Sequence, residues 1–162
     1  MGQTASQVDI AYDWELWIGR ETGTTEAPET TWTQIFGFEA LPFPEQSPED
    51  VDVTHMQSPG RTRETIPGLL PVADWSQEKQ MWPDDDGDIL LDDLAGLTEA
   101  GDKEDVLFEF NLDPAGTGIR RTYRGYVNSY TPTGTVGDKA MATLAVKIME
   151  RQASNSRTIP GE

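Results

Sequence analysis

The sequence EDVDVTHMQSPGRTRETIPGL, residues 49–69, joins a short strand pattern to a long polar segment. Val51 and Val53 alternate with polar residues, as in a half-buried strand. Within residues 55–65, only Met56 has a side chain that can bury much surface, and Pro67 with Gly68 predicts a turn. A polar loop of this length is uncommon in a small domain and usually makes a contact. The stretch therefore predicts a strand followed by a long loop with a binding role.

Composition limits the classes of function. The chain has 162 residues, enough for about one domain, with 12 basic and 29 acidic residues and a formal net charge of −17. Such a chain is repelled by nucleic-acid phosphates and by anionic membranes. It contains no cysteine, which excludes disulfides and thiolate metal sites. Without an apolar run of membrane-spanning length or a signal-peptide pattern, we expect a soluble protein made in the cytoplasm, with no membrane partner.

Short alternating runs predict one mainly β domain over residues 13–151, with polar arms at residues 1–12 and 152–162. Strands are expected near residues 14–18, 32–38, 51–53, 69–82, 106–112, 119–130 and 140–149. Residues 114–118 should form the turn of a β-hairpin between the strands expected at residues 106–112 and 119–130. One helix is expected over residues 88–101, with Asp88 as N-cap, Gly101 as stop and leucines facing the sheet. This pattern favours a β-sandwich or barrel with one flanking α-helix.

No motif predicts a catalytic, cofactor or metal site. The acidic cluster at residues 84–88 allows a calcium loop, but the EF-hand spacing would put Trp82 at the first ligand position. We favour a solvated loop that caps the helix. His55 is the only histidine and stands near Ser58, but no nucleophile-elbow sequence is present and a structural zinc site lacks ligands.

Arginines gather in two short windows of this acidic chain. The first holds Arg61 and Arg63, and the second holds Arg120, Arg121 and Arg124. They could meet acidic surface on a neighbouring copy and set the register between subunits. They could equally give solubility to a long loop and protect a hairpin edge from random pairing. The sequence alone leaves both interpretations open.

Two segments together resemble a known family. One is residues 49–69, and the other is FEFNLDPAGTGIRRTYRGYVNSYTPTGTVGDKAMATLAVKIMER, residues 108–151, built around Tyr-Arg-Gly-Tyr-Val at residues 123–127. Their order and spacing resemble the major tail tube proteins of long-tailed, siphovirus-like bacteriophages and of gene transfer agents, over roughly residues 30–151. That family is similar in fold to the tube proteins of type VI secretion and other contractile systems.

The resemblance implies a structural, non-enzymatic subunit without a cofactor. Six copies would form a ring, and rings would stack into a virion tail tube that is assembled in the host cytoplasm. Genomic DNA would pass through an acidic lumen without specific binding. The implied partners are further copies of the chain, a tape measure protein, a tail terminator and distal tail or tip proteins. The residues expected between subunits are His55, Met56, Ser58, Arg61, Arg63, Glu64, Arg120, Arg121 and Arg124.

An alternative is an acidic soluble β-domain that binds carbohydrate or calcium. The five tryptophans support it, because aromatic platforms suit sugars, although most of them lie at strand positions typical of a core. A small hydrolase is the third possibility, and the spacing that such chemistry needs is missing.

Overall fold

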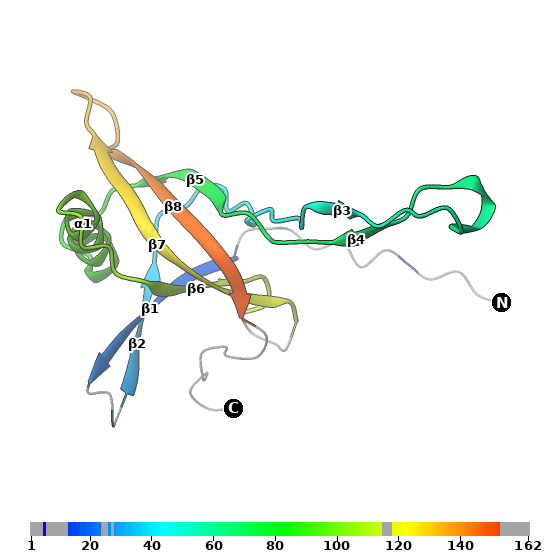
Figure 1. Cartoon of the computed structure of the whole chain (residues 1–162). Helices are drawn as coiled ribbons and strands as arrows, with labels where there is room; N and C mark the ends of the chain where they lie inside the picture. Colours follow the sequence, from blue (N-terminus) through cyan, green and yellow to red (C-terminus); the bar gives the residue numbers. More distant parts are fainter. Residues whose placement is uncertain (1–4, 6–12, 24–25, 27, 115–117, 153–162) are drawn as a thin grey trace.

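The computed structural model describes residues 5, 13–23, 26, 28–114 and 118–152 (Figure 1). Its elements are β1 (Glu15–Gly23), β2 (Pro28–Ile35), β3 (Asp50–Asp52), the 3-10 turn η1 (Pro59–Arg61), β4 (Thr65–Pro67), β5 (Ala73–Gln80), α1 (Asp86–Glu99), β6 (Val106–Asn111), β7 (Arg120–Thr133) and β8 (Met141–Gln152). Six strands form one antiparallel sheet in the order β2-β1-β6-β7-β8-β5, and β3 pairs with β4 outside it. The predicted polar arms at the two chain termini lie outside the described residues, except Ala5 and Gln152.

Alternation along the chain predicted the central strands correctly. In β8, Ala142, Leu144, Val146 and Ile148 are buried, as the pattern required. The β-hairpin expected from residues 106–112 and 119–130 is formed by β6 and β7, in which Phe108 pairs with Tyr123. Apolar alternation is informative here because one face of each strand packs on the core.

Three strands differ most from the prediction. The second, expected near residues 32–38, is β2, which begins at Pro28 and ends at Ile35. The first strand continues past Ile18 to Gly23, because β1 and β2 extend each other as an antiparallel ladder up to the Gly23–Pro28 pair. The strand predicted over residues 69–82 is confined to β5. The chain before it leaves the body as β4, whose only partner among the described strands is β3.

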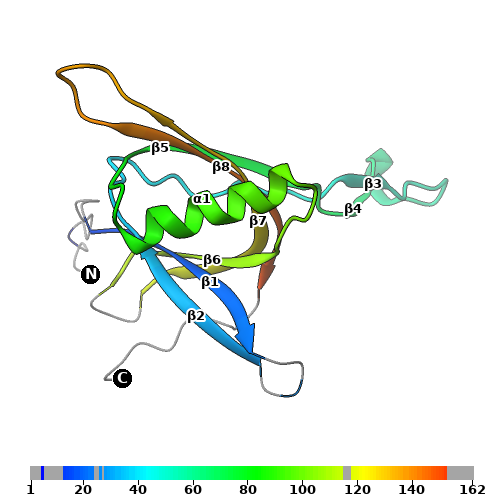
Figure 2. The same ribbon diagram turned by 90° about the vertical axis from the view of Figure 1, so that its left-hand side faces the viewer.

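The helix begins two residues earlier than predicted. Asp85 is the N-cap, and its side chain accepts a hydrogen bond from the backbone N–H of Gly87. The prediction of Asp88 as N-cap is therefore wrong. Leu91 and Leu94 are buried against the sheet, as expected, and Figure 2 shows α1 lying across it.

Asp88 instead lies at the centre of a buried polar network. Its Oδ1 accepts a 2.7 Å hydrogen bond from Lys79 Nζ, and its Oδ2 accepts from Tyr130 Oη at 2.9 Å and from the backbone N–H of Trp82 at 2.7 Å. Lys79 Nζ also donates to the carbonyl oxygen of Gln80. The network links the start of α1 to β5 and β7, and its paired charges satisfy each other away from water.

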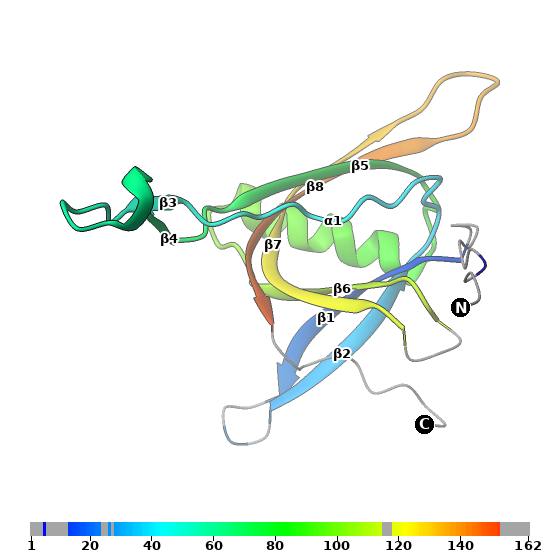
Figure 3. The ribbon, with the colours of Figure 1, turned by 90° about the vertical axis from the view of Figure 1, so that its right-hand side faces the viewer.

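Two glycines allow close backbone contacts, one just after β2 and one inside β7. Gly37 has φ +94° and accepts a 2.8 Å hydrogen bond from Gln80 N–H, next to a bridge between Phe38 and Lys79. This contact joins the chain after β2 to the opposite edge strand, β5, and partly closes the curved sheet (Figure 3). At the β7–β8 bulge, a Cβ on Gly125 would lie 2.1 Å from the carbonyl oxygen of Lys147.

The core lies between the curved sheet and α1. Phe110 is its aromatic centre, with its ring 5.6 Å from Trp75, 5.9 Å from Tyr123 and 5.3 Å from Phe43. Further apolar side chains from four strands and the helix fill the remainder: Leu16, Ile18, Phe108, Val127, Leu144, Val146, Ile148, Leu91, Leu94 and Ala95. The domain is mainly β with one flanking helix, which confirms the expected fold class. In the part of the chain that the structure describes, no helix could span a membrane.

Candidate assembly interface

Residues 49–69 form a hairpin arm that projects from the body (Figure 1). Backbone hydrogen bonds hold it together from its root, where Glu49 N–H donates to Leu69 O, to Val53, whose N–H donates to Glu64 O. Every residue of β3 and β4 is exposed. A hairpin this isolated gains little from packing and is marginal alone in water. The arm is therefore the feature of this chain that most requires a partner.

The tip of the arm is held by its own polar side chains. Ser58 Oγ donates a 2.7 Å hydrogen bond to Glu64 Oε2, and the backbone N–H of His55 donates to Ser58 Oγ at 3.0 Å. His55 Nδ1 accepts from the backbone N–H of Gln57, and its Nε2 lies 3.7 Å from Glu64 Oε2. The serine hydroxyl thus points to a carboxylate and not to the imidazole. His55, Ser58 and Glu64 shape a turn and do not form a nucleophile–base pair.

The other predicted arm residues face solvent. Met56 is 97% exposed at the tip, and Arg61 has φ +58° at the end of the 3-10 turn. Arg63 donates a 3.1 Å hydrogen bond to Asp52 while its side chain stays 83% exposed. The pKa of Asp52 lies below its ordinary value mainly because Thr54 donates hydrogen bonds to its carboxylate. The hydrogen bond from Arg63 lowers the pKa further, by a smaller amount.

The arginines of β7 form a second group, away from the arm, and each contacts its own chain. Arg120 Nε lies 3.7 Å from Glu109 Oε1, and the guanidinium of Arg121 lies 5.3 Å from the ring of Phe43. Arg124 lies 3.3 Å from Asp105 and 3.6 Å from Glu150, with its side chain 41% exposed. These contacts support the fold. A role between subunits stays a prediction for all three.

Several apolar residues of the arm and its root, which were not among the residues predicted between subunits, are exposed. Val51 and Ile66 are cross-strand partners, and both are exposed. Leu69, Leu70 and Val72 follow at the root, and Leu69 is 82% exposed. Consecutive exposed apolar residues are unusual on a monomer and mark an interaction surface. The run Ile66 to Val72 carries the signal in sequence, because it is apolar yet interrupted by Pro67, Gly68 and Pro71.

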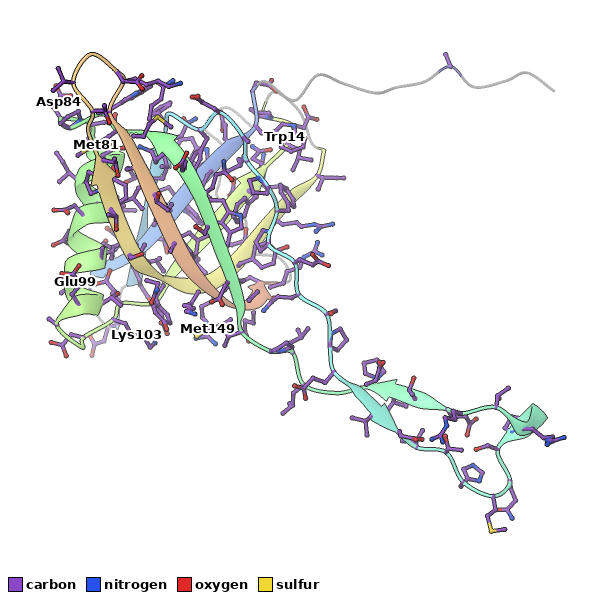
Figure 4. The ribbon with its side chains drawn as sticks, turned by 90° about the horizontal axis from the view of Figure 1, so that it is seen from above. Trp14, Met81, Asp84, Glu99, Lys103 and Met149 are labelled. Atoms are coloured by element: carbon purple, nitrogen blue, oxygen red, sulfur yellow. The ribbon has the colours of Figure 1, made fainter. Side chains whose placement is uncertain are left out.

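A second exposed apolar group lies at the opposite end of the body. The rings of Phe36 and Trp82 stack at 5.6 Å, with 10° between their planes. Trp14 is also partly exposed there, and it lines a pocket of about 300 Å³ together with Phe36 and Phe38. Figure 4 shows Met81 and Asp84 at the end of the body away from the arm, Trp14 at the opposite corner of the body from Asp84, and Met149 near the arm's root.

Burial of the tryptophans differs from the expectation. Trp75 is the only one of the five in the core, where its Nε1–H donates to the carbonyl of Pro42 at 2.7 Å. Trp14 and Trp82 are exposed, and Trp17 and Trp32 are half-buried. Trp17 and Trp32 occupy strand positions on the face of the sheet away from the core, which the residue type alone did not indicate.

The described residues contain no group of three His, Cys, Asp or Glu side chains that could hold a metal ion. Asp84 and Asp86 are exposed, Asp85 caps α1 and Asp88 is paired with Lys79. The four carboxylates of the acidic cluster thus serve different purposes. This arrangement agrees with the helix-capping interpretation of the cluster.

Comparison with solved structures identifies the fold. The chain is similar to a chain in the tail of an empty gene transfer agent particle with C6 symmetry, at TM-score 0.55 and 22% identity, covering 89% of this chain and 96% of the other. It is similar to a chain of the six-fold symmetrised anti-feeding prophage baseplate, at TM-score 0.61 and 8% identity, covering 91% and 96%.

A third similar structure is the sheath-tube complex of an extracellular contractile injection system, at TM-score 0.59 and 14% identity, covering 90% of each chain. No protein-family model and no curated protein matches the sequence. At these identities the likeness establishes the fold. The chain therefore has the fold found in phage-like tails and injection tubes, as its resemblance implied.

Proposed function

We propose that this chain is the structural subunit of a virion tail tube, in which six copies form a ring and the rings stack. The observation that carries the proposal is the arm of residues 49–69, which projects from a tail-tube fold with its apolar residues exposed. Such an arm suits a subunit that reaches from one ring to the next. The six-fold symmetry of the similar assemblies supports a ring of six.

Ring closure would use the two edges of the sheet. Among the described strands, β2 pairs only with β1, and β5 pairs only with β8, so both edges stay open except where Lys79 and Gln80 meet residues 37–38. An open edge offers unpaired backbone donors and acceptors to another chain. In the proposed ring, each copy joins its sheet edges to those of its two neighbours, so that the edges are covered by assembly.

The net charge suits a channel for DNA. Six copies of charge −17 carry −102 per ring. A lumen that takes part of this charge repels phosphates, so genomic DNA passes without the tight contacts that would slow it. The proposed partners are a tape measure protein, a tail terminator and distal tail or tip proteins. The proposed location is the tail of a phage or gene transfer agent.

The proposed role is structural and not enzymatic. Among the described residues, a serine, a histidine and a carboxylate meet at the arm tip, and there Ser58 donates to Glu64 and not to the imidazole. A carbohydrate-binding role is the second candidate. It is favoured by the exposed Trp14 and Trp82, because exposed aromatic faces suit sugar rings.

Native mass spectrometry of the purified protein tests the ring directly. We expect species at six times the 17.9 kDa chain mass, and multiples of six as the concentration rises. A monomer at every concentration that gains thermal stability from an oligosaccharide would favour the second candidate. Replacing Trp14 and Trp82 with alanine should remove that gain.

A further inference from the structure

Lys79 and Asp88 place an amine against a carboxyl group inside the domain. Nζ and Oδ1 lie 2.7 Å apart, and the two side chains are 0% and 2% exposed. Neither group takes part in the proposed contacts between subunits. A primary amine is a nucleophile, and its condensation with a carboxylic acid gives an amide and water. The pair therefore has the two functional groups of an internal covalent cross-link.

Burial favours the amide over the ion pair. In water, an amide is hydrolysed because its products, an ammonium ion and a carboxylate, are well solvated. The buried site of Lys79 and Asp88 lacks this solvation, and two charges removed from water carry a large desolvation cost. The amide is neutral. Condensation therefore removes the desolvation cost, and the water that is released can leave for the solvent.

The surroundings of Asp88 suit nucleophilic attack on its carboxyl group. Its Oδ2 accepts hydrogen bonds from Tyr130 Oη at 2.9 Å and from the backbone N–H of Trp82 at 2.7 Å. Two donors at this distance stabilise the negative charge that develops on the oxygen of an attacked carbonyl group. Lys79 Nζ also donates a 2.6 Å hydrogen bond to the carbonyl oxygen of Gln80, which holds the amine beside Oδ1.

We propose that Lys79 and Asp88 condense, after the domain has folded, into an amide between Nζ and Cγ. One proton passes from the ammonium to Oδ1, and the neutral amine attacks Cγ to give a tetrahedral intermediate with its negative charge on Oδ2. The nitrogen then gives a second proton to Oδ1, the Cγ–Oδ1 bond breaks, and Oδ1 leaves as water. The third proton of the ammonium stays on the amide, so the step needs no oxidant, reductant or cofactor.

The cross-link joins two elements that other covalent bonds connect only through the chain. It ties β5, an edge strand, to the first turn of α1 and closes a loop over residues 79–88. The ion pair is the form in which the chain folds, and the amide forms from it. Both residues belong to one copy, so the bond forms in a single subunit as well as in a ring. Its test is therefore independent of the proposed tube.

Trypsin digestion tests the bond in the natural protein. The basic residues on either side of Lys79 are Arg63 and Lys103, so an unlinked chain gives two peptides, residues 64–79 and 80–103. Trypsin does not cleave after an acylated lysine. Folded protein incubated at neutral pH should therefore give one peptide, residues 64–103, that is lighter by one water. Fragmentation should place the lost water between Lys79 and Asp88. Two separate peptides of full mass would overturn the proposal.

The same digest distinguishes the cross-link from water loss elsewhere. Asp86 precedes Gly87, and an Asp-Gly pair can lose water by forming a cyclic imide in its own backbone. The imide leaves Lys79 open to trypsin, so peptide 80–103 alone would be lighter by one water, and this result would also overturn the proposal. Protein kept unfolded in urea should give the two separate peptides, because the unfolded chain does not hold the amine against the carboxyl group.

Two variants test the chemistry. Lys79→Arg is the matched control, because it keeps a cation beside Asp88 while its guanidinium is a poor nucleophile, and its intact mass should show no loss of water. In Asp88→Asn, the amide oxygen suits the donors of Tyr130 and Trp82, and the nitrogen faces Lys79. Condensation then releases ammonia in place of water. The condensed variant should therefore have the same mass as the condensed natural protein, although the two unreacted chains differ in mass.

Tyr130→Phe tests the role of the donor at Oδ2. Loss of one such donor should slow the formation of the joined peptide about a hundredfold, while the order of events stays the same. The rate is measured by digesting samples taken at intervals after refolding. A rate equal to that of the natural protein would overturn the role of Tyr130 in the condensation.

Discussion

Lys79 and Asp88 form an ion pair that is removed from solvent, with 2.7 Å between Nζ and Oδ1 and side-chain exposures of 0% and 2%. The pair joins β5, an edge strand of the sheet, to the first turn of α1. Tyr130 of β7 donates to the same carboxylate, so three elements meet at Asp88. A buried charge is tolerated only when its partners are all present. The network therefore fixes the position of the helix against the sheet.

Breaking this ion pair should be costly. Lys79→Met leaves the Asp88 carboxylate buried without its cation and should lower the free energy of unfolding by about 3–5 kcal/mol. Urea denaturation followed by tryptophan fluorescence measures the loss. The matched control is Lys139→Met, which removes an exposed partner of Glu39 and should change stability little. Equal losses of unfolding free energy in the two variants would show that burial of the Lys79–Asp88 pair does not make it more important for stability than an exposed pair.

Tyr130 should make the protein sensitive to alkali. Burial and the hydrogen bond to Asp88 raise the pKa of Tyr130 above its ordinary value of 10.0. A raised pKa means that the folded state holds the phenol proton more tightly than the unfolded state, so this contribution is complete below pH 10 and is lost as pH rises above it. Tyr130→Phe should cost about 2 kcal/mol at pH 7, where it removes a hydrogen bond to a charged group.

The difference in unfolding free energy between the natural protein and Tyr130→Phe should therefore shrink between pH 10 and pH 11. Urea denaturation of both proteins at pH 7, 10 and 11 measures it. Titration of other groups affects both proteins alike. A difference that stayed constant over this range would contradict the assignment.

The β7–β8 bulge should not accept a side chain at Gly125. Gly125→Ala places a Cβ 2.1 Å from the carbonyl oxygen of Lys147, which is backbone and cannot rotate away. We expect a loss of about 3 kcal/mol or more, because the two longest strands must separate locally. Gly134→Ala is the control, since nothing lies within 4 Å of its Cβ position. Thermal unfolding monitored by circular dichroism should separate the two variants clearly.

The arm should be dispensable for folding and essential for stacking. Replacing residues 55–65 with a short Gly-Ser linker removes no residue of the core. The thermal midpoint of the body should therefore change little, while long tubes should be absent from electron micrographs. Tubes of natural length from this variant would remove the arm from the assembly mechanism.

The sequence predicted the strands whose alternation reflects burial on one face. The pattern of β8 and the β6–β7 hairpin were correct because their apolar faces meet one core. Apolar alternation was less informative for β1 and β2, because their outer ends pair through Thr22, Thr31 and Gly23 and lack that alternation. Local pattern thus identified the core strands and missed the extension of the edge hairpin.

Long-range partners explain the remaining differences. Asp88 looked like an N-cap because acidic residues favour helix starts, but its partner Tyr130 is 42 positions away and could not be identified from local pattern. The nine residues predicted between subunits divide into six on the arm and three on β7. The apolar surface of the arm was not predicted, because apolar residues such as Ile66 and Leu69 usually indicate a buried strand and their exposure depends on the arm leaving the body.

Electron microscopy of the concentrated, negatively stained protein tests the central claim most directly. The tube proposal predicts hollow, striated tubes, or rings whose averaged end views have six-fold symmetry. The experiment is repeated with purified tail tips as seeds, so that a missing initiator does not hide assembly. Compact single subunits in both preparations, at every concentration, would contradict the proposal that this chain builds a tail tube.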